Sequence, residues 1–131
     1  MTLVDTSVWV NFFRAHRPVN LESLVEFDDI VTCPPVIQEV LSGFRDEAAL
    51  RRARESMLAL PILDSPLPLA RYLEAAELFR RGRRAGLTIR SPVDCLIGAI
   101  ACAADVEVLH TDRDFVALAK ISPLRQRSSK K

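Results

Sequence analysis

The chain has 131 residues, of which 49% are hydrophobic, and its formal net charge is +1. This length favours one domain spanning residues 1–131, and no apolar run reaches the roughly 20 residues that a membrane span needs. The N-terminus also lacks the basic and apolar regions of a signal peptide, so we expect a cytoplasmic protein. The three cysteines are odd in number and have no C-x-x-C spacing, which favours core positions over disulfides or zinc ligands.

The first ten residues predict a short buried strand that leads directly into a helix. Thr2–Val4 is the β-type run, and Asp5 stands at its carboxyl end. Apolar residues within 8–13 then follow a helical spacing, and we expect Thr6 or Ser7 to cap this helix. Because ligands of open α/β sheets bind at the carboxyl ends of strands, Asp5 is a candidate site residue.

The next third of the chain alternates helix, strand and helix. Apolar spacing predicts a short helix over 21–27, and the β-type run Ile30–Cys33 predicts a second strand. A helix is expected over Pro35–Phe44, where proline fits the first turn. Glu39 lies on the edge of its buried stripe. An arginine-rich helix is expected over Asp46–Leu60.

The remaining elements continue the alternation. Pro61–Asp64 is a candidate short strand, and Leu69–Ala85 has the pattern of a long amphipathic helix. Ser91, Pro92 and Asp94 fit the N-cap, first and third positions of a helix that is apolar on nearly every side.

The C-terminal part predicts one more strand and one more helix. The strand is Val106–His110, with Asp112 at its end, and a short helix follows around Phe115. The basic tail, residues 125–131, is expected to be frayed. Strands that alternate with helices indicate a three-layer α/β/α sandwich with a mainly parallel sheet.

Four acids follow expected strand ends or open helices at the same edge of such a sheet: Asp5, Glu39, Asp94 and Asp112, with Asp114 two residues further on. Carboxylates that lie close together repel one another, and a divalent cation relieves this repulsion. Oxygen ligands without His or Cys favour Mg²⁺ or Mn²⁺ over zinc. Each acid also has a simpler explanation as a helix cap, a turn residue or a solvated helix residue.

Taken together, Leu3-Val-Asp5-Thr-Ser7, Glu39 after a proline, Asp94 at the start of a small-residue helix and His110-Thr-Asp112-Arg-Asp114-Phe115 resemble a PIN-domain ribonuclease. The length and layout are similar to the VapC-type toxins of toxin–antitoxin pairs. The resemblance implies one PIN-like domain over 1–131. It also implies an acidic quartet of Asp5, Glu39, Asp94 and Asp112 that is catalytic and binds Mg²⁺ or Mn²⁺, with Thr6, Ser7 and Asp114 as accessory residues.

The same resemblance implies an RNA substrate, such as single-stranded loops of tRNA, a cognate antitoxin and a homodimer. The segments 9–13 and 41–60 leave room for a dimer interface. Fifteen of the eighteen cations are arginine, which suits phosphate binding, and the cations of 80–84 and of the tail could hold the RNA backbone. Trp9 could stack a base and His110 could transfer a proton, although core or dimer-interface packing explains Trp9 more simply, and core packing explains His110 more simply.

Three other functions fit parts of the pattern. A housekeeping PIN nuclease would have the same acids, and a non-catalytic module could bind a basic peptide in an acidic groove. A phosphotransfer or phosphatase site on a similar sheet fits less well. The receiver type needs a mid-chain acceptor aspartate and a lysine that ends a strand, and the dehalogenase-like type needs Asp-x-Asp where this chain has Asp5-Thr-Ser7.

Overall fold

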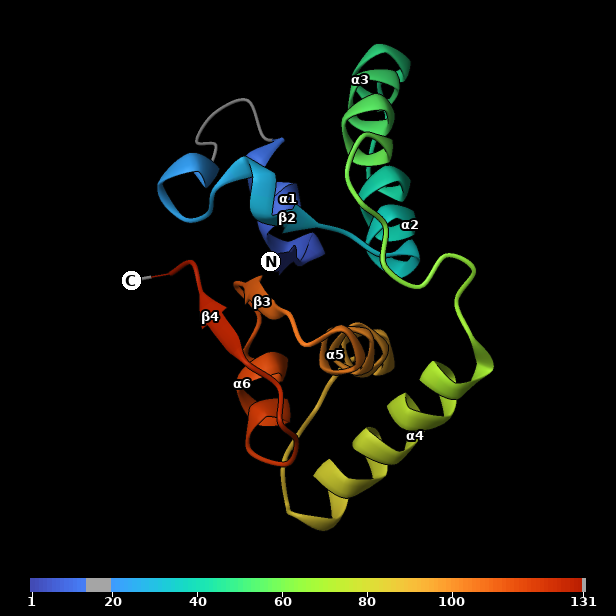
Figure 1. The fold of residues 1–131 in the computed structure, drawn as a ribbon, viewed down its shortest axis with the longest axis vertical. Coiled ribbons are helices and arrows are strands. Elements are labelled where there is room, and N and C mark those ends of the chain that lie inside the picture. Colours follow the sequence, from blue (N-terminus) through green and yellow to red (C-terminus); the bar gives the residue numbers. More distant parts are fainter. Residues whose placement is uncertain (14–19, 131) are drawn as a thin grey trace.

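The strands form one parallel sheet of order β2-β1-β3-β4 in the computed structural model, which describes residues 1–13 and 20–130 (Figure 1). Leu3 in the central strand β1 is paired with Val31 of β2 and with Val108 of β3. All three side chains are fully buried, as expected of a parallel sheet that is covered on both faces. The strands are β1 (Thr2–Val4), β2 (Ile30–Val31), β3 (Glu107–His110) and β4 (Gln126–Ser128).

Six α-helices connect and cover the strands within the described ranges. Because parallel crossovers are right-handed, the connection from β1 to β2 lies over one face, and those from β2 to β3 and from β3 to β4 lie over the other. Figure 1 shows α5 and α6 beside β3 and β4. The helices are α1 (Thr6–Phe12), α2 (Pro34–Ser42), α3 (Glu47–Leu58), α4 (Leu69–Arg84), α5 (Pro92–Ala104) and α6 (Arg113–Ala119).

Helix α5 is the central helix of the molecule, as its nearly uniform apolar composition predicts. Its residues 97–101 are buried, and its neighbours include α4, α6 and β3. A Cβ atom added at Gly98 would lie 3.3 Å from Leu118 of α6, so glycine at this position lets the two helices pack closely. Ser91 caps the helix by accepting a hydrogen bond from the Asp94 amide, as predicted. The prediction of an α/β fold with a parallel sheet is therefore confirmed.

Two predicted elements are different in the structure. The 21–27 segment is not one helix: Leu21–Ser23 and, further on, Phe27–Asp29 are single 3-10 turns. The Pro61–Asp64 segment makes only an isolated bridge, between Thr32 and Ile62, because it touches the end of β2 at one point and then turns away.

The expectation of a frayed C-terminal tail was wrong for residues 126–128. These residues form β4, which is paired with residues 108–110 of β3. The Ser129 amide donates to the His110 carbonyl at 2.8 Å, and Arg127 forms an ion pair with Glu107 at 3.1 Å. Polar residues can occupy this strand because it lies at the edge of the sheet, where backbone pairing does not require apolar side chains. Lys131 lies outside the described residues.

Among the described residues, no helix has both the length and the apolar character needed to cross a membrane.

Candidate functional site

Asp5 connects the central strand to the start of α1. It is the N-cap of α1, where Thr6 or Ser7 had been expected: its Oδ2 accepts hydrogen bonds from the Ser7 amide at 3.1 Å and from the Ser7 hydroxyl at 2.6 Å. The cap prediction was wrong because β1 ends at Val4 and α1 begins at Thr6, which leaves Asp5 as the single residue between them. The other oxygen, Oδ1, is buried and has no hydrogen-bond partner in the described part of the chain. Burial raises the pKa of Asp5 above its ordinary value.

Asp94 is the acid whose protonation is most altered by the fold. It lies in the first turn of α5, its residue is 6% exposed, and its Oδ2 has no hydrogen-bond partner among residues 1–13 and 20–130. Burial, followed by the proximity of Asp112 and Asp5, raises the pKa of Asp94 from 3.8 to about 10. Without a cation beside it, this carboxyl group therefore keeps its proton at neutral pH.

Asp94, Asp112 and Asp114 form the most compact acidic group that the structure describes. One oxygen of each lies within 4.8 Å of the others. Asp112 caps α6 by accepting from the Asp114 amide at 2.9 Å. Asp114 is buried and accepts from the backbone amides of Arg90 (3.1 Å) and Ser91 (3.0 Å), so it ties α6 to the entrance of α5. The sequence had placed Asp114 only in an accessory position.

Glu39 lies on the other side of Asp5, outside this compact group. Its residue is exposed, and its Oε1 accepts a hydrogen bond from the Thr6 hydroxyl at 2.8 Å. Its charge contributes to the raised pKa of Asp5, so the two carboxylates interact through space. Glu39 therefore lies next to the start of α1, at the exposed rim of the region of Asp5, Asp94, Asp112 and Asp114, which we call the acidic pocket.

Ser7 links the two halves of the pocket. Its hydroxyl donates to Asp5 and accepts from the Thr111 amide at 3.0 Å, so it joins the end of β1 to the loop after β3. The Asp5 amide also donates to the Leu109 carbonyl at 2.9 Å. These contacts fix Asp5 relative to the loop that carries Asp112. The Thr6 hydroxyl therefore contacts Glu39, whereas the Ser7 hydroxyl contacts Asp5.

The acids fit a divalent cation on structural grounds. The buried oxygens Asp5 Oδ1 and Asp94 Oδ2 are left without hydrogen bonds in the described chain, and an unpaired buried oxygen costs free energy. Within the part of the chain that the structure describes, the compact group consists of carboxylates, without His or Cys. Such oxygen ligands suit Mg²⁺ or Mn²⁺. Asp94 and Asp112 would hold such an ion together with Asp5, whose charge acts on Asp94, because both oxygens of Asp114 already accept hydrogen bonds from backbone amides.

His110 is packed and hydrogen-bonded, in agreement with the simpler of its two predicted roles. It is 1% exposed and its ring lies against Phe115. Its Nδ1 accepts from the Asp112 amide at 3.1 Å, and its Nε2 lies 2.6 Å from the Gln126 Oε1. Nε2 must therefore carry the proton, and the ring supports the Asp112 loop. The sequence could not assign a role to Gln126, because its strand was not predicted.

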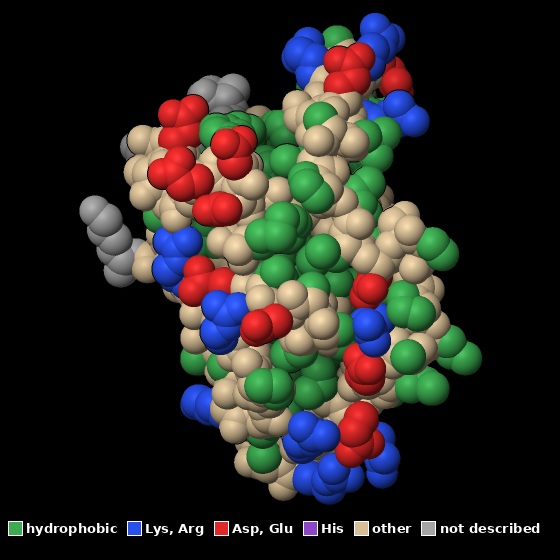
Figure 2. All heavy atoms as spheres, in the orientation of Figure 1, with side chains coloured by type: hydrophobic (Ala, Val, Ile, Leu, Met, Phe, Trp, Pro, Cys, Tyr) green, Lys and Arg blue, Asp and Glu red, His purple; other side chains and the backbone are tan. Residues whose placement is uncertain are grey.

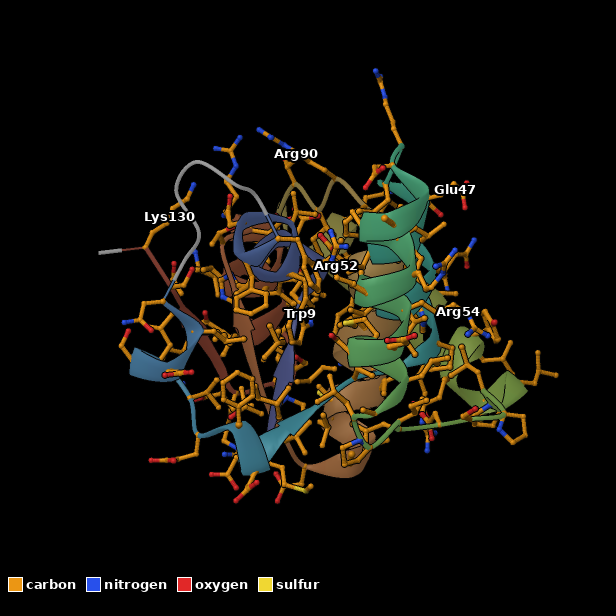
Figure 3. The ribbon with its side chains drawn as sticks, turned by 90° about the horizontal axis from the view of Figure 1, so that it is seen from above. Trp9, Glu47, Arg52, Arg54, Arg90 and Lys130 are labelled. Atoms are coloured by element: carbon orange, nitrogen blue, oxygen red, sulfur yellow. The ribbon has the colours of Figure 1, made fainter. Side chains whose placement is uncertain are left out.

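Trp9 is a core residue. It is 3% exposed and packs against Phe12 and Phe13 in the interior of the molecule (Figure 3). This packing excludes the base-stacking and interface roles that the sequence had left open for Trp9 itself.

A cavity of about 570 Å³ lies beside the acids, on the side of β4 and α6. It shares Asp112 with the acidic group, and Ser7 and Thr111 connect it to Asp5. Its lining is formed by Ser7, Arg90, His110, Thr111, Asp112, Arg113, Val116, Ser128 and Lys130.

Comparisons with known proteins agree with this architecture. Residues 2–121 match the PIN domain family. The chain is 36% identical to Ribonuclease VapC11 of Mycobacterium tuberculosis over 133 aligned residues, which cover 98% of each protein. Among solved structures, a member of the VapBC family of toxin–antitoxin systems, VapBC-5 from M. tuberculosis, has a TM-score of 0.72 at 22% identity and 97% coverage of both chains.

The sarcin–ricin loop cleaving toxin VapC20 of M. tuberculosis also has a TM-score of 0.72, at 18% identity, and the match covers 95% of this chain and 99% of that one. At these low identities the structural likeness concerns the fold alone.

Proposed function

The chain belongs to the VapC group of the PIN-domain family, and on that premise we propose that it is a Mg²⁺- or Mn²⁺-dependent endoribonuclease that hydrolyses RNA phosphodiester bonds. The observation that carries the proposal is the buried Asp94 carboxyl, which lies near Asp5 and Asp112 and has an oxygen without a hydrogen-bond partner in the described chain. Such an arrangement destabilises a folded protein unless a cation occupies it. The similarity to VapC11, which is named a ribonuclease, supports the same activity.

Each acid has a defined task in this proposal. Asp5, Asp94 and Asp112 would hold the cation, with Asp94 ionised after its proton is released to solvent. When bound, the divalent ion lowers the pKa of water and neutralises charge on the phosphoryl group. Ser7 holds Asp5 in place through its 2.6 Å hydrogen bond. Glu39, oriented by Thr6, lies at the rim, where an RNA strand would enter.

The experiment that tests this function is metal-dependent cleavage of RNA. Purified protein should cleave total bacterial RNA with Mg²⁺ or Mn²⁺ and fail to do so with EDTA, while Asp94→Asn and Asp5→Asn should lose cleavage by about a thousandfold or more. Asp46→Asn is the matched control, because Asp46 also begins a helix, accepts from the Ala49 amide at 2.8 Å and lies on α3. Asparagine is an equally good helix cap, so this variant should cleave like the wild type.

A non-catalytic acidic groove is the competing function. If the wild type cleaves no RNA with either metal, and Asp94→Asn still binds a basic peptide as the wild type does, the nuclease proposal is wrong. Within the nuclease class, the chain could be a toxin or a housekeeping enzyme. A short upstream reading frame that encodes a DNA-binding partner would favour the toxin.

We propose further that the nuclease is the toxin of a toxin–antitoxin pair, acting in the cytoplasm, where RNA is found. Support comes from its likeness to chains such as VapBC-5, a member of a toxin–antitoxin family. The acidic pocket offers a cognate antitoxin a place for a basic side chain, because an arginine or lysine would neutralise Asp94 and Asp112 as a metal ion does. Co-expression with the adjacent partner should block cleavage.

An exposed apolar surface supports the proposed homodimer. Leu69, Tyr72 and Leu73 of α4 are 50% to 71% exposed. Figure 2 shows hydrophobic side chains at the surface over the first part of α4. A groove of about 460 Å³ between α4 and α5 continues this surface. The double variant Leu69→Glu, Leu73→Glu should sediment as a monomer, whereas Leu58→Glu on α3 should sediment as the wild type does.

A further inference from the structure

The cavity beside the acids differs from them in charge. Three cationic side chains line it: Arg90, Arg113 and Lys130. Among the described residues that line it, Asp112, at the boundary with the acidic group, is the one carboxylate. The pocket that would bind a cation therefore adjoins a cavity suited to anions.

The three cations come from separate segments whose backbones are fixed. The Arg90 amide donates to Asp114 at 3.1 Å, and Arg113 directly follows the Asp112 cap at the start of α6. The Lys130 amide donates to the Ser128 hydroxyl at 3.1 Å, just beyond β4. Figure 3 shows Arg90 and Lys130 in the upper part of the view, with Arg54 of α3 well away from both. The fold thus brings cations from three segments to one cavity.

Several of the other arginines, including those that the sequence indicated for RNA binding, form ion pairs elsewhere in the molecule. Arg80 and Arg84 both form ion pairs with Glu77, and Arg127 forms one with Glu107. In contrast, the side chains of Arg90, Arg113 and Lys130 form no ion pair within the described residues, and all three residues are exposed. They are therefore available to an anionic ligand.

We propose that this cavity binds the RNA backbone on one side of the scissile phosphodiester, with Arg90, Arg113 and Lys130 contacting its phosphates. The inference rests on the proposed nuclease function and names the substrate-binding residues of the same site. A cluster of carboxylates repels RNA, so the strand needs cations close to the acids. Asp112 belongs both to the acidic group and to the lining of the cavity. The cation site and the anion site therefore meet at Asp112, and a phosphodiester bound across this boundary would lie beside the cation that is needed for its hydrolysis.

This assignment replaces the arginines 80–84 that the sequence had indicated. They stand at the carboxyl end of α4, which Figure 1 shows at the far end of the molecule from α1. Arg83 lies over the Phe79 ring, and two of its neighbours are paired with Glu77. Within the described part of the tail, Lys130 keeps the predicted role, whereas Arg125 and Arg127 form ion pairs with Asp105 and Glu107.

The test compares two triple variants that remove the same charge. One is Arg90→Gln, Arg113→Gln, Lys130→Gln, and the other is Arg80→Gln, Arg83→Gln, Arg84→Gln. Metal-dependent cleavage of a short fluorescein-labelled single-stranded RNA is followed over a range of salt concentrations. The cavity variant should raise KM by about tenfold or more with kcat little changed, and the dependence of log KM on log salt should become shallower by about 2, since each lost phosphate contact removes about 0.7.

The α4 variant should keep the KM, kcat and salt dependence of the wild type. A third variant, Arg90→Lys with Arg113→Lys, retains the charge and should keep most of the salt dependence, which separates loss of charge from damage to the fold. Circular dichroism and Tm measurements of all variants identify unfolded protein.

The outcomes distinguish this inference from the proposed function. If the wild type cleaves RNA and the cavity variant has the same KM and salt dependence, or if the α4 variant takes the loss instead, the cavity assignment is wrong. If the cavity variant keeps its RNA affinity and loses binding of an acidic peptide such as polyglutamate, the cavity is a protein site and the inference is also wrong. Absence of any cleavage by the wild type refutes the nuclease function itself.

Discussion

The Thr6 hydroxyl donates a hydrogen bond of 2.8 Å to the Glu39 carboxylate. The two residues are 33 positions apart in sequence, and the contact joins the first residue of α1 to the middle of α2. It turns the Glu39 side chain toward the strand end that carries Asp5, although the residue remains exposed to solvent. Glu39 is therefore held at the rim of the pocket, separate from the compact group formed by Asp94, Asp112 and Asp114.

Glu39→Gln should lower kcat for RNA cleavage by about tenfold or more, because it removes a negative charge from the rim of a cation site. Its Tm should change little, since the residue is exposed. Thr6→Val, which leaves the carboxylate in place but without its donor, should give a smaller loss. Glu55→Gln, an exposed acid of α3, is the control. Equal kcat values for Glu39→Gln and Glu55→Gln would exclude a role for Glu39 at the site.

The stability of the metal-free protein should fall as the pH rises. The pKa of Asp94 is about 10 in the folded state and 3.8 in its ordinary environment, so between these values the folded protein binds the proton more tightly than the unfolded chain does. Stability is full below pH 4 for this group and is lost progressively toward pH 10. Asp94→Asn should remove most of this dependence, because the raised pKa of Asp5 leaves a smaller part of the same sign, and it should stabilise the metal-free protein relative to the wild type at neutral to alkaline pH.

Urea unfolding in EDTA at several pH values measures this effect. Asp46→Asn is a suitable control, because it alters an exposed helix cap of α3 without touching the pocket. A free energy of unfolding for Asp94→Asn that follows the wild-type pH dependence would mean that Asp94 is not the group responsible.

Divalent cations should stabilise the folded wild type. An ion that binds only the folded state adds about 2.7 kcal/mol when its concentration is about 100 times the dissociation constant. Adding Mn²⁺ to EDTA-treated protein should therefore raise the Tm, and the double variant Asp5→Asn, Asp94→Asn should show no such rise. Asp105→Asn, an exposed acid at the end of α5, should respond as the wild type does. A Tm of the double variant that still rises with Mn²⁺ would place the ion elsewhere.

The hydrogen bond between His110 and Gln126 should affect RNA cleavage indirectly, because it positions the Asp112 loop. The Gln126 Oε1 accepts a hydrogen bond from the protonated Nε2 at 2.6 Å, which leaves Nδ1 free to accept from the Asp112 amide. In Gln126→Leu the Nε2–H tautomer is no longer favoured, and kcat should fall by about tenfold, which is the lower end of the effect of losing an outer hydrogen bond around a metal ligand. Gln126→Glu, which can still accept, should restore most of the activity.

Nitrogen NMR of the His110 ring provides the readout that distinguishes positioning from simple folding. The wild type and Gln126→Glu should show a protonated Nε2, and Gln126→Leu should show a mixture of tautomers. An unchanged tautomer with reduced kcat in Gln126→Leu would mean that the ring does not position Asp112.

Local sequence patterns were enough to predict the elements that carry the acids. The apolar run before Asp5 and the Ser91-Pro92 start of α5 predicted β1 and the central helix, because burial and helix capping are properties of neighbouring residues. The alternation of strands and helices then predicted a parallel sheet and the common edge at which these acids lie. The fold class and the candidate acids could therefore be read from the amino-acid sequence itself.

Only the tertiary structure decided the relations between distant segments. It added β4 as an edge strand, held by backbone pairing that leaves no apolar periodicity to read. It placed Asp114 in the compact group and Glu39 at the rim, because side-chain distances depend on how α2, α5 and α6 pack. It also brought Arg90 to the acids, since an exposed loop cation has no local pattern that reveals its neighbours.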